Sequence, residues 1–457
     1  MPTPRAITLL LLVGLLTAWL GQSLIGPPRP DGSPDRLLLP LQVQAAHDDE
    51  RILIRLRWPT PEAHRYHDVL RFDGERWEVL GAGDAPGLGE ERVSMMLDDG
   101  GVPEFARYGG YLLIGDGTRF MPGAADEADV EAHPILGQEL GLSDIRKHLP
   151  DSRLGRWDEV PSTTALEAQR AAGYFLDLWH WRGDRGGPVN VVDDLHVAEH
   201  RHPDQGRSSY GTNWDDERGQ PRYMFDPERA GQRALHAGQF DTDGMAPADT
   251  RFLTPDNRLD FDPEHDWQPG DTLPRRFLRE ADGSRADIEG HGGWENGWRE
   301  VVFSRALDTG NPLEDKVIRP GGQYSVAFAV HSGGATGRHH HVSLPLSLGL
   351  DRPADIPVQR MPGGRPDWSR ESREVLLFYP GQVNWPRITG PRHAGAEAVD
   401  QGIPASARHD AYQLALYGVE AEAEDAVVRR WLISVGLGLL FIVAVAAAGL
   451  SLGRRGP

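Results

Sequence analysis

Short runs in which every second residue is apolar constrain the fold of this 457-residue chain more than any other feature. Within the run 51–57, Ile52, Ile54 and Leu56 alternate with Leu53 and three arginines. A two-residue period places these three side chains on one face of a β-strand. Comparable runs, separated by Gly, Pro and Asp, occupy 92–99, 174–182, 298–307, 323–331 and 340–348. We therefore expect a mainly β chain in which residues 37–350 form an antiparallel β-sandwich.

Two regions depart from this strand pattern. Residues 193–292 are rich in Asp, Arg, Gly and Pro and contain few apolar runs. This composition favours turns over strands, so we expect a long irregular insertion at one end of the sandwich. Residues 351–428 contain many prolines and are expected to form a C-terminal extension.

Two long apolar segments stand near the ends of the chain. Residues 6–26 follow a single arginine, and residues 431–453 contain no charged side chain. Each segment is long enough to span a bilayer as a helix. We expect residues 1–26 to be a signal peptide or signal anchor, residues 27–36 to be a Pro-rich linker, and residues 429–457 to be a transmembrane anchor with a cytoplasmic tail. The main domain is then expected on the extracytoplasmic, periplasmic side of the cell membrane.

The net charge and the absence of cysteine exclude several classes of function. A formal net charge of -20 argues against a nucleic-acid partner, because binding to phosphates requires a basic surface. A chain without cysteine forms no disulfide, iron–sulfur cluster, cysteine-type zinc site or covalent c-type haem. Histidine, methionine and tryptophan in apolar surroundings remain, and a non-covalent b-type haem needs axial ligands such as His or Met.

Three adjacent histidines, 339–341, introduce the last of the apolar runs. Strand alternation places His340 on the same face as Val342 and Leu344. Its two histidine neighbours point to the opposite face, so the three imidazoles cannot converge on one metal ion. We expect His340 to point into the core or into a cofactor pocket; a core histidine with satisfied hydrogen bonds is the alternative.

Further candidates for a haem pocket are a methionine and the residues of one aromatic strand. Met121 lies in a Gly/Pro turn rather than in an apolar stripe, which leaves both a ligand role and a packing role open. Trp179 and Trp181 share one face of their strand, and Arg182 shares the other face with His180. The tryptophans are candidates for pocket walls and Arg182 for pairing with a propionate. An edge strand whose polar face meets water is the alternative.

Several sequence motifs follow one another along the chain. They are RVSMMLDD, FARYGGYLLIGDGTRFMPG, KHLPDSR, DLWHWRGDRGGPVNVVDD, GWREVVFSRAL, YSVAFAVHSGGATGRHHHVSLP and VLLFYPGQVNWPRI. They occur in the order seen in ethylbenzene-dehydrogenase-related cytochromes, and over residues 40–410, apart from the insertion, the chain resembles the haem-binding gamma subunits of DMSO-reductase-type molybdenum enzymes. The resemblance implies a β-sandwich that holds haem and relays electrons outside the cytoplasmic membrane. It also implies a redox partner, either a molybdenum-enzyme catalytic subunit or a membrane quinone or cytochrome system.

The resemblance also implies particular ligands. In the b-type members one axial ligand is a methionine in a turn and the other a lysine or histidine after the VAFAV strand, and these positions match Met121 and His340. Many relatives carry a covalent Cys-x-x-Cys-His motif where this chain has residues 110–114, and some carry a second one at 405–409. Both cysteine pairs are absent here.

These observations lead to one expectation and one alternative. We expect a membrane-anchored electron-transfer protein, or a subunit of an oxidoreductase, that holds one non-covalent haem b and makes no bonds itself. Its iron ligands would be Met121 and His340, Phe328 would join the two tryptophans as a pocket wall, and Arg338 would join Arg182 as a propionate partner. The alternative is a sandwich that has lost haem and remains as a scaffold or binding module of a membrane redox complex.

Overall fold

A computed structural model describes residues 38–61, 66–81, 88–119, 123–236, 252–332 and 340–378, together with Leu432, Val435, Gly436 and Gly438. None of the helices in these ranges is long and apolar enough to cross a membrane. The expected signal segment, the linker, Met121, Arg338, the chain from 379 to 430 and most of the expected anchor lie outside the described residues.

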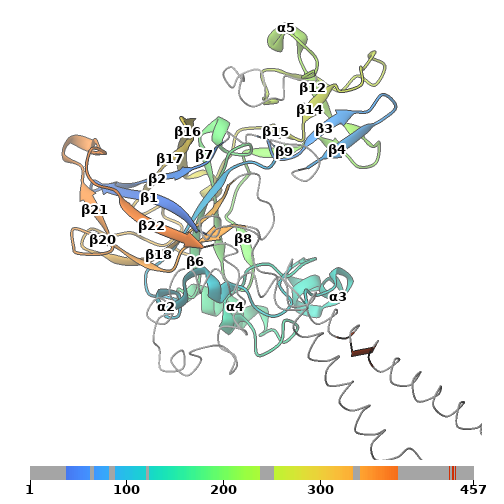
Figure 1. The fold of residues 1–457 in the computed structure, drawn as a ribbon. Helices are drawn as coiled ribbons and strands as arrows, with labels where there is room; N and C mark the ends of the chain where they lie inside the picture. Colours follow the sequence, from blue (N-terminus) through green and yellow to red (C-terminus); the bar gives the residue numbers. More distant parts are fainter. Residues whose placement is uncertain are drawn as a thin grey trace, which may run out of the picture. The chain divides into compact units, whose positions relative to one another are not determined.

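The described chain is mainly β, and ten strands of its largest sheet close into a barrel (Figure 1). Around the ring the order is β19-β22-β1-β2-β17-β16-β7-β6-β5-β18 and back to β19. Two more strands, β20 and β21, also link β18 to β1, because β20 pairs with β18 and with β21, and β21 pairs with β1. Strand β8 pairs with β7. The barrel strands are β1 (Leu38–His47), β2 (Arg51–Pro59), β5 (Arg92–Asp98), β6 (Leu176–Arg182), β7 (Val191–Val197), β16 (Ile288–Glu295), β17 (Trp298–Ala306), β18 (Gln323–His331), β19 (His341–Val342) and β22 (Arg373–Phe378), and the additional strands are β8 (Arg201–Pro203), β20 (Leu346–Leu350) and β21 (Ile356–Arg360).

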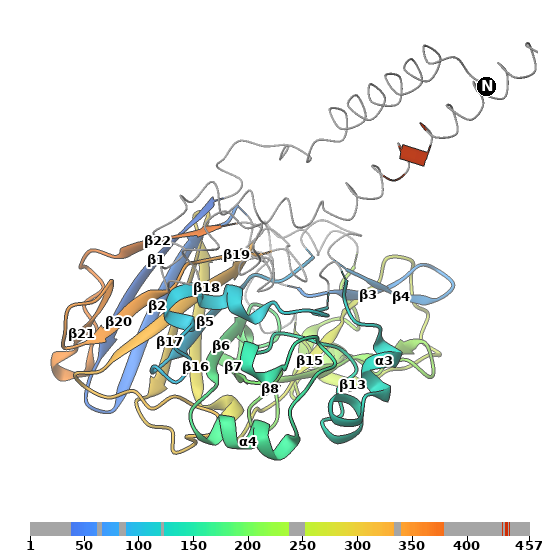
Figure 2. The ribbon, with the colours of Figure 1, turned by 90° about the horizontal axis from the view of Figure 1, so that it is seen from below.

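A two-residue strand closes the barrel, so the expected two-sheet sandwich is not confirmed. Val342 of β19 pairs with Ala329 of β18 on one side and with Phe378 of β22 on the other (Figure 2). Pairing on both sides removes the free strand edges that a sandwich leaves at each end of its sheets. Strand alternation does not distinguish the two architectures, because both bury one face of every strand.

The inward faces of the barrel strands fill its interior with apolar side chains. On β2, Ile52, Ile54, Leu56 and Trp58 are all fully buried. Large aromatic side chains from other strands pack into the same core, and the ring of Trp58 meets that of Trp181 edge-on at 6.5 Å. The barrel is therefore closed by packing as well as by hydrogen bonds.

The region 193–292, expected as an irregular insertion, begins in β7, ends in β16 and builds a second core between them. This core includes Trp77, Phe225, Leu253 and Trp267. Residues 66–88 contribute to it as well, which the sequence pattern did not indicate. Its elements are β3 (Val69–Phe72), β4 (Trp77–Leu80), β9 (Tyr210–Thr212), β10 (Trp214–Asp215), β11 (Gln220–Pro221), β12 (Tyr223–Phe225), α5 (Pro227–Ala230), β13 (Arg258–Asp260), β14 (Thr272–Pro274), β15 (Arg276–Leu278), and the short helices η5 (Gly187–Val189) and η8 (Ser284–Ala286).

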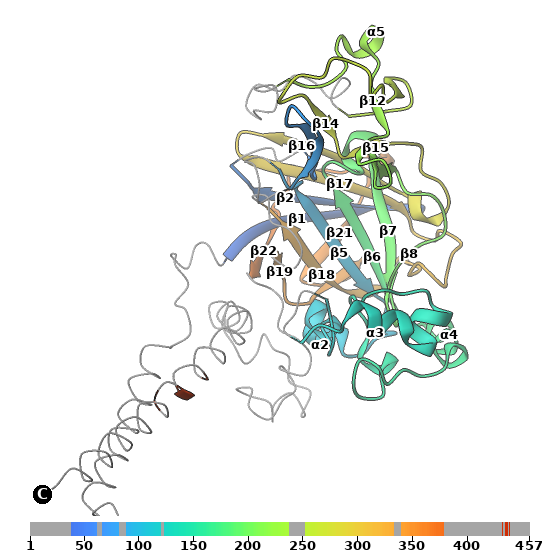
Figure 3. The same ribbon diagram turned by 90° about the vertical axis from the view of Figure 1, so that its right-hand side faces the viewer.

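Most of the helices lie in the connection between β5 and β6. Figures 1 and 3 place α2, α3 and α4 together next to the ends of β6, β8 and β18, and α2 and the following turn η2 contact β18. Side-chain caps start the longer helices: Asp126 accepts from the amide of Ala128, and Ser162 from that of Ala165. The helices are α2 (Phe105–Tyr108), η2 (Gly109–Leu113), α3 (Glu127–Ala132), η3 (Pro134–Glu139), η4 (Pro150–Ser152) and α4 (Thr163–Ala171), with η9 (Pro362–Gly364) near the C-terminal strands.

Candidate functional site

A cavity of about 420 Å³ lies between the outer face of β5, β6 and β18 and the connection that covers them. Its volume falls within the range typical of small-molecule sites. Residues from the β5–β6 connection and from the chain around β19 form the opposite wall. The lining residues are His67, Arg92, Ser94, Met96, Gly110, Ile114, Thr118, Arg119, Arg146, Lys147, Leu178, His180, Arg185, Arg201, Ala327, Phe328, Ala329, His331, His340, Val342 and Ser343.

The floor of the cavity is built from small and apolar side chains on three paired strands. Ser94 of β5 pairs with His180 of β6 and Ala329 of β18, and one step along, Met96 pairs with Leu178 and Ala327. Side chains in register across a sheet stand side by side on one face. Ser94, Ala327 and Ala329 are small, so the side chains of this floor leave open space above a largely apolar surface.

His180 presents an N–H group to this floor. Its Nδ1 lies 3.2 Å from Nη2 of Arg182. Because a guanidinium only donates hydrogen bonds, Nδ1 accepts and the proton of the neutral ring resides on Nε2. Nε2 is buried and has no hydrogen-bond partner among the described residues. Burial, followed by the charges of Arg182, Arg201 and Arg92, lowers the pKa of His180 well below 6.5, so the ring is neutral at pH 7.

Two further histidines that line the cavity form a stacked pair, His331 at the end of β18 and His340 just before β19. Their ring centroids lie 4.4 Å apart with an interplanar angle of 17°. The side chains are 8% and 4% exposed. His340 is thus buried at the cavity, as strand alternation predicts, and its neighbour His341 is only half-buried. An imidazole is a suitable ligand for a transition metal.

The rim of the cavity is strongly cationic. Six of the lining residues are Arg or Lys, and no acidic residue lines the cavity within the part of the chain that the structure describes. Burial, with Arg201 as the second cause, lowers the pKa of Lys147 to about 8. Burial and neighbouring arginines lower the pKa of Arg201 to about 9. Cations whose pKa values are depressed in this way favour an anion, and carboxylates are the simplest anions for an arginine fork.

Glu90 holds two of these arginines in place from behind the rim. Its Oε1 accepts from Nε of Arg92 at 3.1 Å and from Nε of Arg185 at 2.7 Å. Glu90 is buried and does not itself line the cavity. The arginines are thus oriented by an internal partner and keep further N–H donors for a ligand.

The structure brings only some of the expected site residues together. His340 lines the cavity. Phe328 borders it, but pairs with Met95 and belongs to the barrel core. Trp179 and Trp181 also pack inside the barrel, because the cavity lies on the opposite face of β6. Arg182 does not line the cavity either; it pairs with Asp193 and donates to His180.

Sequence reasoning missed most of the cavity. His180 was assigned to the polar face of its strand but not to the site, and His331, Met96 and the rim cations were not selected. The usable signal was the outward face of β5, β6 and β18, where histidine, small residues and arginine follow one another at every second position.

Comparisons with known proteins give one family match and one partial relative. A family model described as ethylbenzene dehydrogenase matches residues 23–343. A cytochrome c-552 from Stutzerimonas stutzeri is 40% identical over 78 residues, which cover 17% of this chain and 26% of the relative. The match therefore spans about a quarter of the length of that relative.

Proposed function

Because the chain belongs to the ethylbenzene dehydrogenase family, we propose that it is an electron-transfer protein that holds one non-covalent b-type haem in the cavity beside β5, β6 and β18. The observation that carries the proposal is the combination of an apolar floor, the inward His340 and a rim of six cations. A flat apolar ring with carboxylate groups needs these three features. A cytochrome among the partial relatives supports the same conclusion.

The wall formed by η2 gives independent support. The family resemblance aligns residues 110–114 with the covalent haem motif of other members, and Gly110 and Ile114 both line the cavity. The cavity is thus where covalent relatives would attach their haem. With no cysteine in the chain, only coordination and packing remain to hold the group.

Each group of residues then has a defined task. His340 is proposed as one axial ligand and Met121 as the other. The N–H of His180 and the rim arginines would hold the propionates, and Phe328 and the floor residues would exclude water. When bound, haem supplies reversible one-electron exchange. The rim cations favour the reduced state because its net charge is more negative.

The proposal extends to location and partners. Residues 6–26 and 431–453 would hold the barrel on the extracytoplasmic side of the cell membrane. The apolar segments are long enough to span the bilayer, and arginines beside a membrane span favour the cytoplasmic side. Membership of the family suggests association with a molybdenum enzyme. Electrons would pass between haem edges without bond making, so the chain would serve as a redox subunit.

An absorption spectrum tests the proposal. The full chain, expressed with ample haem and purified in detergent, should show a Soret band and a b-type reduced spectrum. His340→Ala should remove or reshape the band, whereas His341→Ala, the half-buried neighbour, should leave it unchanged. Absence of a band, together with no binding when haem is titrated into the purified protein, would favour the haem-less scaffold instead.

A further inference from the structure

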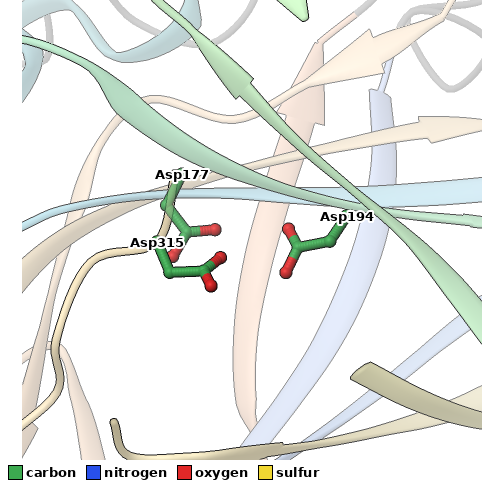
Figure 4. Close-up of side chains that lie close together, drawn as sticks. All are labelled: Asp177, Asp194 and Asp315. Atoms are coloured by element: carbon green, nitrogen blue, oxygen red, sulfur yellow. The ribbon is translucent and has the colours of Figure 1, made fainter. Parts of the chain in front are cut away.

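Three buried carboxylates meet at the inner face of the barrel. Asp177 of β6, Asp194 of β7 and Asp315 from the connection between β17 and β18 each bring one oxygen within 4.8 Å of the other two. Figure 4 shows Asp177 and Asp315 side by side, with Asp194 pointing toward them. Pairing of β6 with β7 brings Asp177 and Asp194 together, and the β17–β18 connection adds Asp315.

Each of the three carboxylates is held by one oxygen and leaves the other without a donor. Oδ2 of Asp177 accepts from Nη1 of Arg305 at 2.5 Å and from the Lys316 amide at 3.0 Å. Oδ1 of Asp194 accepts from the Leu195 amide at 3.0 Å. On Asp315, Oδ2 accepts from the Thr309 hydroxyl at 2.6 Å and from the Ser284 hydroxyl at 3.4 Å.

The remaining oxygens are Oδ1 of Asp177, Oδ2 of Asp194 and Oδ1 of Asp315, and within the described ranges no hydrogen bond reaches any of them. The three residues are at most 2% exposed. Buried carboxylate oxygens are ordinarily hydrogen-bonded, so three unbonded oxygens in one cluster require another partner. One anchored oxygen and one outward oxygen per carboxylate is the arrangement expected of metal ligands with supporting hydrogen bonds.

The charge balance also calls for a cation. Arg305 contacts Asp177, and its Nη1 lies 3.6 Å from Oδ1 of Asp315. Lys316 directs its Nζ to Asp99 at 2.7 Å and to Asp98 at 3.6 Å, away from the cluster. One guanidinium therefore faces three carboxylates.

We propose that Asp177, Asp194 and Asp315 bind a calcium ion inside the barrel. The donors are all carboxylate oxygens, which hard cations prefer and which suit neither copper nor zinc in the absence of His or Cys. Calcium is favoured over magnesium because it accepts irregular carboxylate cages, whereas magnesium retains water that a buried site has little room for.

The ion would join three separate segments of the fold. β6 carries Asp177 on its inner face and His180 of the cavity on its outer face. β7 and the β17–β18 connection supply the other ligands. Calcium would thus fix the strand that forms one edge of the cavity floor, without touching the ligand of the cavity itself.

The competing explanation is a proton. A proton shared between two of the three carboxyl groups would also relieve their repulsion. The two explanations differ in their response to calcium and to chelators, and neither depends on whether haem is bound.

The experiment uses the full chain, purified in detergent and stripped with EDTA. Calorimetric titration at pH 7 should find one Ca²⁺ per chain, and 1 mM Ca²⁺ should raise the melting temperature by about 2 °C or more. Mg²⁺ should give a smaller rise; an equal or larger one overturns the choice of calcium. No bound calcium and an unchanged melting temperature overturn the site and favour the shared proton.

Matched variants locate the ion. Asp194→Asn and Asp315→Asn should lose calcium binding and the calcium-dependent rise, whereas Asp367→Asn, whose exposed carboxylate bonds within its own turn, should keep both. Unchanged binding in both site variants overturns the assignment.

Terbium luminescence in the unmodified chain gives the result if a variant does not fold. Emission that is sensitised by tryptophan and lost when calcium displaces terbium is expected, because Trp179 pairs with Asp194 in the sheet. No sensitised emission counts against the site.

Discussion

Arg182 donates from Nη2 to Nδ1 of His180 across 3.2 Å, and this bond determines what His180 can do in the cavity. With Nδ1 occupied as an acceptor, Nε2 carries the ring proton and acts as a donor. His180 is therefore a partner for a carboxylate rather than a ligand for a metal. His340, which also lines the cavity, remains the imidazole suited to coordination.

Removing the rim charge should lower the reduction potential of the bound haem. Arg201→Gln deletes one cation from the cavity lining while keeping a side chain of similar length. If Arg201 stabilises the reduced haem by about 1.4 kcal/mol relative to the oxidised haem, its loss should lower the midpoint potential of this one-electron couple by roughly 60 mV. Spectroelectrochemical titration measures the shift. Arg218→Gln changes an exposed arginine in the region 193–292 and should leave the midpoint potential unchanged.

Filling the floor should block the cavity without unfolding the barrel. Ala329 is only half-buried and faces the cavity, so Ala329→Phe places a ring where the flat ligand would lie. Haem affinity should fall at least tenfold, which corresponds to about 1.4 kcal/mol. Ser304→Phe adds the same ring to the half-buried face of β17 and serves as control. Retained haem affinity in Ala329→Phe would show that the ligand lies elsewhere.

The pH dependence of stability should report the neutral state of His180. Burial lowers its pKa well below 6.5 in the folded chain, and unfolding returns the pKa to about 6.5. Below pH 6.5 the unfolded chain binds a proton that the folded chain does not, so this contribution is complete above pH 6.5 and is lost as the pH falls. Between pH 6 and 5, the free energy of unfolding of the haem-free chain should fall more steeply than that of His180→Gln. The difference should be up to about 1.4 kcal/mol per pH unit. Urea denaturation at each pH measures both slopes, and equal slopes would contradict a neutral His180.

Truncation inside the barrel should be costly. Phe303 is fully buried, and its ring lies 6.2 Å from that of Trp179. Phe303→Ala should lower the free energy of unfolding by about 3 to 5 kcal/mol through lost burial and a residual cavity. Leu154 is 74% exposed, so Leu154→Ala should change the value by about 0.5 kcal/mol or less. Denaturant unfolding followed by circular dichroism compares the two.

Strand periodicity predicted many barrel strands closely. The runs at 92–99, 298–307 and 323–331 became β5, β17 and β18 with shifts of one residue at most. The run at 340–348 is divided into β19 and β20. Pro345 has no amide hydrogen for a ladder bond, and Ser343 bonds to Phe328 with both its backbone amide and its side chain.

Closure and the site depended on contacts that are distant in sequence. β19 joins β22, which begins thirty residues further along the chain, and no local pattern encodes that pairing. The cavity likewise combines the outer faces of three strands with a covering connection, and its cations are drawn from positions 92 to 201. His340 was predictable because one face of its own strand is apolar. His331 and His180 were not, because the surface that buries them belongs to other segments.

The two residues of β19 connect the closure of the sheet to the cavity. A strand held by so few bonds opens at a lower free energy than its neighbours, so its amides should exchange with solvent earlier than those of β5 or β6. His340 directly precedes this strand. A ligand bound by His340 would therefore slow amide exchange at residues 341–342 and at Phe378 alike. Cofactor binding could then be measured as slower hydrogen exchange where β19 closes the barrel.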